Sequence, residues 1–87
     1  MARRPTPPTA ADRVTGSVLA AARESASMDL RQVEAATGIS KSVLSRIEQG
    51  GRACRVPELI ALAKVYRVAP TTLIRRITAV AEDTGDD

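Results

Sequence analysis

Five polar side chains that lie within seven positions carry the most specific chemistry in this sequence. They are hydroxyl and long cationic groups, and the chain has no histidine that could act beside them as a general base. An arginine can donate two parallel hydrogen bonds to O6 and N7 of guanine, a lysine can donate to the same acceptors, and a serine hydroxyl can donate or accept. The set therefore suits recognition of a hydrogen-bonding surface better than bond-making chemistry. Its members are Ser40, Lys41, Ser42, Ser45 and Arg46.

A short helix over about residues 30–37 is predicted immediately before this cluster. Asp29 has the side chain of an N-cap, and Gln32 three residues later completes a capping-box pattern. Gly38 ends the helix, because glycine adopts a positive φ without strain at a sharp turn. The side chains expected to face the core are Leu30, Val33 and Ala36.

The cluster itself occupies the start of a second helix, predicted over about residues 41–49. Ser40 caps this helix, and its inward side holds Leu44 and Ile47. Gly50 is a natural residue to follow its end. Two short helices joined by a tight turn, with polar and basic groups at the start of the second, are typical of a helix-turn-helix. In that motif the second helix enters the DNA major groove.

Three more helices are expected around this pair, and no convincing strand or internal repeat is present. An apolar stripe predicts a helix over about residues 11–26, in which Gly16 is slightly unfavourable. Pro57 fits the first position of a later helix, and Pro70 opens the last one. The apolar residues of the three helices are Val14, Val18, Leu19 and Ala22; Leu59, Ile60, Leu62, Ala63 and Tyr66; and Leu73, Ile74, Ile77 and Val80. In the last helix Leu73 and Ile77 can face the core, whereas Ile74 and Val80 lie off their stripe.

Charge divides the chain into a basic body and an acidic end. Four of the 10 acidic residues lie in the last six positions, so residues 1–81 carry 13 basic and 6 acidic side chains. A basic body suits a polyanionic partner, because each neutralised phosphate releases counterions. We expect a flexible Pro-rich arm over residues 1–10, one domain over 11–81 and an acidic tail over 82–87. Arg3 and Arg4 of the arm are candidates for DNA contact.

Several classes of protein are disfavoured by composition. Cys54 is the single cysteine, so neither an intrachain disulfide nor a cysteine-based zinc site is possible. The sequence contains no nucleophile motif, no phosphate-binding glycine loop and no metal-ligand cluster, so we expect no enzyme activity, no catalytic residue, no metal and no cofactor. Its apolar runs are far shorter than the ~20 residues that span a bilayer. A protein of the reducing cytoplasm, associated with the nucleoid and not with a membrane, is predicted.

The predicted helices resemble those of the phage repressor/Cro-type, or Xre-like, DNA-binding domain, over roughly residues 12–80. The strongest matching pieces are residues 36–40, ATGIS, and residues 44–50, LSRIEQG. Residues 59–63 and 68–73 also match the family's pattern. The resemblance implies an all-α, lambda-repressor-like bundle of five helices that binds operator DNA, commonly as a dimer.

Functional roles follow from this resemblance position by position. Base contacts are implied for Lys41, Ser42, Ser45 and Arg46, and contacts to DNA phosphates for Arg31, Ser40, Arg52 and Arg55. A structural ion pair is implied between Arg23 and Glu48. Three positions depart from the family's pattern. Leu30 stands where a glutamine often binds a phosphate, and Ser27 and Arg67 stand where glycines often end helices.

The sequence leaves two classes of function open. The first is a sequence-specific transcriptional regulator, a repressor that binds a pseudo-palindromic operator in double-stranded DNA as a homodimer. The second is a protein-interaction module on the same fold, such as an antitoxin or a protein that binds another regulator, with DNA binding secondary or absent. Apolar residues of the last helix are expected to form the dimer contact. They are Ile74, Ile77, Val80 and Ala81.

Overall fold

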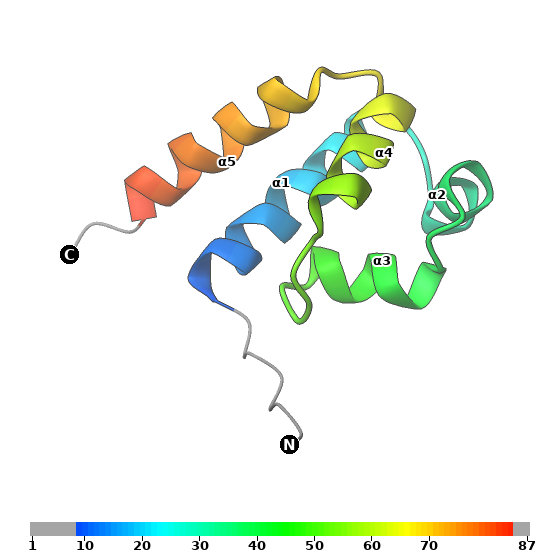
Figure 1. Cartoon of the computed structure of the whole chain (residues 1–87), viewed down its shortest axis with the longest axis horizontal. Helices are drawn as coiled ribbons and strands as arrows, with labels where there is room; N and C mark the ends of the chain where they lie inside the picture. Colours follow the sequence, from blue (N-terminus) through cyan, green and yellow to red (C-terminus); the bar gives the residue numbers. More distant parts are fainter. Residues whose placement is uncertain (1–8, 85–87) are drawn as a thin grey trace.

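A computed structural model describes residues 9–84 of the chain and shows five α-helices and no strand in that range (Figure 1). The all-α bundle predicted from the sequence is confirmed. The helices are α1 (Ala10–Ser25), α2 (Leu30–Thr37), α3 (Lys41–Glu48), α4 (Val56–Tyr66) and α5 (Pro70–Thr84).

One apolar core joins the five helices. The helix α1 contacts α3, α4 and α5, whereas α2 packs against α3 and α4. Every helix contributes at least one side chain that is 2% exposed or less, so none of them is peripheral to the core. These side chains are Leu19, Val33, Leu44, Ile47, Leu62, Ala63 and Leu73.

The turn between α2 and α3 forms as the sequence predicts. Asp29 caps α2 by accepting from the Gln32 N–H at 2.8 Å, while the Gln32 side chain accepts from the Asp29 N–H at 2.8 Å. Gly38 ends the helix in the left-handed conformation, with φ of 78°. Ser40 then caps α3 with its hydroxyl, which accepts from the Val43 N–H at 3.2 Å.

Two other turns use a left-handed conformation without glycine. Ser27 has φ of 57° and Arg67 has φ of 61°. These are the two positions where the related family often has glycine. A side chain in this conformation costs roughly 1–2 kcal/mol. The surrounding packing therefore holds both turns in shape at some cost in stability.

Several helix limits differ from the predicted ones by one to three residues. Ala10 begins α1 and Thr9 caps it, so residues 9 and 10 are not part of an arm. The helix α4 begins at Val56, one residue before Pro57. The helix α5 continues through Thr84, into the predicted acidic tail. The arm residues Arg3 and Arg4 lie outside the described residues.

Two residues predicted to face the core are exposed. Ala36 lies on the solvent side of α2. Ile60 is 52% exposed on α4. The apolar arc of α4 is wider than the surface that its neighbours cover, and its residues Leu59, Leu62, Ala63 and Tyr66 fill the core instead.

Candidate nucleic-acid interface

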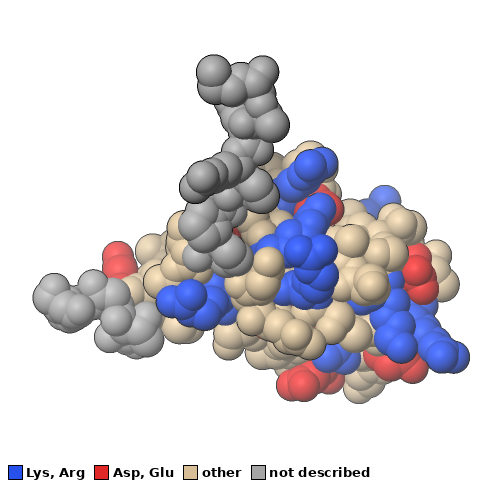
Figure 2. All heavy atoms as spheres, turned by 90° about the horizontal axis from the view of Figure 1, so that it is seen from below, with Lys and Arg blue, Asp and Glu red and all other residues tan. Residues whose placement is uncertain are grey.

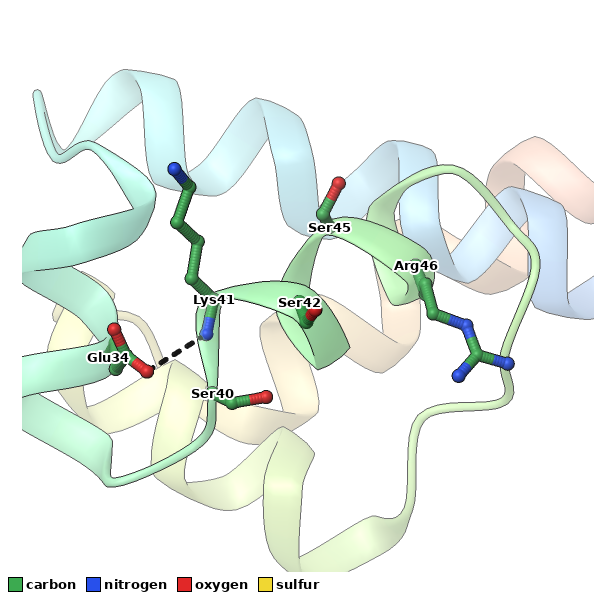
Figure 3. A pocket seen from close by; sticks show the side chains of 6 residues that line it. All are labelled: Glu34, Ser40, Lys41, Ser42, Ser45 and Arg46. Atoms are coloured by element: carbon green, nitrogen blue, oxygen red, sulfur yellow. Dashed lines mark hydrogen bonds between the residues drawn. The ribbon is translucent and has the colours of Figure 1, made fainter.

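The helix α3 is anchored by its apolar side and presents its polar side to solvent. Leu44 is 2% exposed and Ile47 is 1% exposed, whereas Lys41, Ser42 and Arg46 are exposed. These three polar residues line a shallow surface hollow (Figure 3). The hollow is also lined by Ser40 and Ser45, and by Glu34, which belongs to α2. The structure thus places all four predicted base-contacting residues on one open face. Ser45 is half-buried, and its hydroxyl accepts from the Gln49 side chain at 3.0 Å.

Lys and Arg side chains are spread over the face of the molecule that contains α3 (Figure 2). Figure 2 views the molecule from below the orientation of Figure 1, where α3 is the lowest helix. Lys and Arg atoms extend across this face, and Asp and Glu atoms lie mainly toward its edges (Figure 2). Such a field favours a polyanion that approaches α3.

Arg31, one of the predicted phosphate contacts, lies next to this hollow. It is exposed on the first turn of α2. Arg31 and Lys41 line a second depression together with Leu30, which occupies the family's glutamine position. The Leu30 side chain has no hydrogen-bond donor for a phosphate, whereas the neighbouring Arg31 has a guanidinium exposed beside it.

Glu34 is the residue of this surface that sequence reasoning missed. Its carboxylate Oε2 accepts a hydrogen bond from the backbone N–H of Lys41, with N and O 3.2 Å apart. It therefore caps α3 from outside the helix, at the same end as Ser40. Seven positions separate Glu34 from Lys41, and only the path of the turn at Gly38 brings them together.

An ion pair fixes the far end of α3. The Arg23 guanidinium donates to both Glu48 oxygens, Nε to Oε2 at 2.8 Å and Nη2 to Oε1 at 3.0 Å. Its Nη1 also donates to the Met28 carbonyl at 2.9 Å. The hydrogen bond to Glu48 raises the pKa of Arg23. This is the pair that the family resemblance implies, and it joins α1, the following turn and α3.

Gly16 gives α3 its close approach to α1. It is buried within α1, and a Cβ there would collide with the Ile47 carbonyl oxygen and lie 2.8 Å from that of Glu48. The sequence suggested only a slightly weakened helix at this position. Its glycine instead lets the C-terminal backbone of α3 rest directly on α1.

The two arginines of the α3–α4 loop differ in their surroundings. Arg52 donates to both oxygens of Glu58, at 2.8 and 3.1 Å, and to the Ala53 carbonyl at 3.0 Å. Glu58 Oε1 also accepts from the Arg55 backbone N–H at 2.9 Å. The Arg52 guanidinium thus already has a carboxylate partner, which weakens the prediction that it anchors a phosphate. The Arg55 side chain is exposed.

Cys54 and Tyr66 have the properties of packing residues. Burial raises the pKa of the Cys54 thiol to about 11 and that of the Tyr66 hydroxyl to about 12. A thiol with a raised pKa is a poor nucleophile at neutral pH. Among residues 9–84, no three or more Cys, Asp or Glu side chains gather as a metal site. No helix in this range is both long and apolar enough to span a bilayer.

The four residues predicted at a dimer contact divide into two pairs. Ile74 is 51% exposed and Val80 is 39% exposed on α5. Ile77 packs against the core, and Ala81 is half-buried. The exposed apolar residues of α5 are thus Ile74 and Val80, which lie on opposite flanks of the stripe that contains Ile77.

Comparison with known proteins identifies the family. Residues 16–84 match the family described as "Helix-turn-helix domain". No curated protein matches the chain.

Solved structures share the fold at low sequence identity. The clp gene regulator ClgR of Corynebacterium glutamicum is 17% identical with a TM-score of 0.76, covering 83% of this chain and 94% of that one. A second ClgR structure gives a TM-score of 0.82 at 16% identity, over 91% and 84%. The restriction-modification controller protein C.AhdI of Aeromonas hydrophila is 20% identical with a TM-score of 0.70, over 75% and 98%. The match spans all of α2 to α5 and most of α1, and these neighbours have the same fold. The chain therefore belongs to the helix-turn-helix domain family.

Proposed function

We propose that this protein is a sequence-specific transcriptional regulator, a repressor that binds a pseudo-palindromic operator as a homodimer. One observation carries the proposal. The helix α3 is held rigidly by buried apolar residues and an ion pair while its exposed side presents hydrogen-bonding and cationic groups. A rigid helix with such a face is what reading of the major groove requires. Such a regulator works in the cytoplasm, on the nucleoid.

The side chains divide the task by their positions. Lys41, Ser42 and Arg46 on the exposed face of α3 contact base edges, and Ser45 contributes from its half-buried place. Contacts to phosphates fix the register on DNA without reading sequence. They come from Arg31, Ser40 and Arg55, and from Arg52 where a phosphate can compete with Glu58.

The dimer follows from the amount of sequence that one recognition helix can read. One helix contacts only ~4–6 base pairs, which are too few to distinguish one site in a genome. A twofold dimer doubles the number of base pairs contacted. Ile74 forms the centre of the contact, with Ala81 two turns away on the same face of α5 and with Ile77 and Val80 beside it.

A second function is favoured by apolar residues on α4. Val56 is 68% exposed and Ile60 is 52% exposed, one turn apart on the same helix face. Such residues suit a protein partner. A protein-interaction module that uses this surface, with DNA binding secondary, is therefore the alternative.

A titration with duplex DNA separates the two functions. The protein is titrated with random-sequence duplex at several salt concentrations, and binding sites are then selected from a random pool. A regulator binds random duplex with an affinity that falls steeply with salt, and selection returns inverted repeats whose centres lie about one helical turn apart. Absence of measurable binding at low salt would rule out the regulator and favour the interaction module.

A further inference from the structure

Glu34 places a negative charge within the surface proposed to meet DNA. It lines the same hollow as Lys41, Ser42 and Arg46 (Figure 3). Its carboxylate is directed toward the first residue of α3, whereas the Lys41 side chain extends away from it (Figure 3). The hydrogen bond from the Lys41 N–H holds Oε2 at this end of the helix.

No nearby cation neutralises this carboxylate in the part of the chain that the structure describes. The ion pairs found over residues 9–84 join Arg23 to Glu48 and Arg52 to Glu58. Glu34 is exposed, and its hydrogen bond comes from an uncharged backbone group. Its charge therefore acts on whatever approaches the hollow.

This charge opposes binding to DNA in general. The N-terminus of a helix attracts anions through its free N–H groups and its dipole. Here Glu34 already supplies an anion at that end of α3, so a phosphate that contacts Ser40 there is bound more weakly than it would be without Glu34. Unless a donor from DNA meets the carboxylate, every sequence is bound more weakly.

The base edges in the major groove differ in how they meet a carboxylate. Guanine presents two acceptors there, and thymine presents an acceptor and a methyl group. Adenine presents an amino donor beside the acceptor N7. Cytosine presents its N4 amino group without a neighbouring acceptor of its own, so a carboxylate is complementary to it.

We propose that Glu34 is a specificity-determining residue that accepts a hydrogen bond from the N4 amino group of a cytosine in each half-site. The same charge lowers affinity for unrelated DNA. Glu34 thus raises specificity in two ways, by a contact to the preferred site and by repulsion of other sequences. This inference rests on the proposed function, and it adds a residue of α2 to the reading surface of α3.

Selection of binding sites from random duplex tests the inference with two variants. Glu34→Ala removes the acceptor, so the cytosine preference at one position of each half-site disappears. Its affinity for scrambled duplex at low salt rises roughly fivefold, the effect of one like-charge repulsion in a watery interface. Glu34→Gln keeps an oxygen for the Lys41 N–H and gains an amide donor. It shifts the same position toward adenine, with which glutamine pairs through N6 and N7.

A charge-matched control is available at the end of α5. Glu82 is also exposed, and the last turn of α5 lies across the molecule from the N-terminus of α3 (Figure 1). Glu82→Ala changes the net charge by the same amount and should leave the selected sequence and the affinity for scrambled duplex unchanged. Melting curves of all variants establish that each one is folded.

Three outcomes would overturn the inference. If Glu34→Ala selects the same bases as the unmodified protein with equal affinity for scrambled duplex, Glu34 serves only to cap α3. If affinity for scrambled duplex rises while every base preference stays, the carboxylate repels phosphates but reads no base. If the unmodified protein selects no site at all, the proposed function itself fails, a result seen before any variant is tested.

Discussion

At the residue scale, exposed cations of the interface are expected to behave in two ways. Arg46 on α3 faces the groove, so Arg46→Ala should weaken binding to the preferred site by about 1–3 kcal/mol and relax preference at one position of each half-site. Arg55→Ala should weaken binding to all sequences by a similar factor and reduce the salt slope by about one ion. Titration against selected and scrambled duplex at several salt concentrations measures both effects. Equal losses on the two duplexes for Arg46→Ala would show that α3 does not read bases.

The ion pair between Arg23 and Glu48 is expected to affect the stability of the fold and not the reading of DNA. Their side chains are 17% and 12% exposed, so Glu48→Ala leaves a largely buried guanidinium without its partner. We expect a loss of about 2–3 kcal/mol, somewhat below the loss for a fully buried pair. DNA affinity should fall only as far as unfolding explains, which a melting curve measured beside a DNA titration shows. A stable Glu48→Ala variant with poor DNA binding would place Glu48 in the interface instead.

Sequence reasoning at this scale succeeds where a residue acts through its own helix. The polar side of α3 and the Ser40 cap follow from local spacing. Contacts across loops do not follow from it, because they depend on the path of the chain. Two contacts depend on the path of the chain in this way: the hydrogen bond from the Lys41 N–H to Glu34, and the ion pair between Arg52 and Glu58.

At the element scale, Gly16 determines how closely α3 can approach α1. In an exposed helix, glycine to alanine gains about 1 kcal/mol. At Gly16 the added methyl would collide with carbonyl oxygens of α3, and such overpacking costs about 1–3 kcal/mol or more. Gly16→Ala should therefore lower the melting temperature, whereas Ser17→Ala at the exposed neighbouring position should leave it equal or slightly higher. A stabilised Gly16→Ala protein would contradict the close contact.

The start of α4 should respond to acid through Glu58. The hydrogen bond from Arg52 lowers the pKa of Glu58. A lowered pKa in the folded state stabilises the protein above the unfolded value, near 4.3, and this stabilisation is lost as pH falls through the folded pKa. The melting temperature of Glu58→Gln should thus lie below that of the unmodified protein at pH 7, with the gap closing in acid. Glu82→Gln serves as the exposed control, and a gap independent of pH would argue against the ion pair.

The order and type of the elements were predictable, and some of their limits were not. Asp29, Gln32 and Gly38 mark the ends of α2 with local chemistry, and the structure agrees. Pro57 suggested a helix start one residue late. In the structure the Arg55 backbone N–H donates to the Glu58 carboxylate, so Arg55 is the N-cap and Val56 is the first helical residue. Ile60 lies in a continuous apolar arc, so only the packing of neighbouring helices decides that it is exposed.

At the scale of the whole molecule, the expected assembly rests on apolar surface that the single chain leaves exposed. Two helices offer such surface, α5 through Ile74 and α4 through Ile60, and their exposures of 51% and 52% are nearly equal. The pair therefore makes a matched test, because the same substitution in each should affect folding of the single chain to a similar extent. Only the one that lies in the interface between two copies should change the assembly.

We expect Ile74→Glu to yield a folded monomer and Ile60→Glu to remain a dimer. A glutamate at the centre of an apolar contact loses its hydration and faces a second glutamate across the twofold axis, so association is strongly disfavoured. Sedimentation at micromolar concentration measures the assembly, and titration with a full operator and with a single half-site measures its consequence. Ile74→Glu should lose most of the gain in affinity that the second half-site provides. A monomeric unmodified protein, free and on the full operator, would refute the dimer, whereas dissociation by Ile60→Glu alone would move the contact to α4.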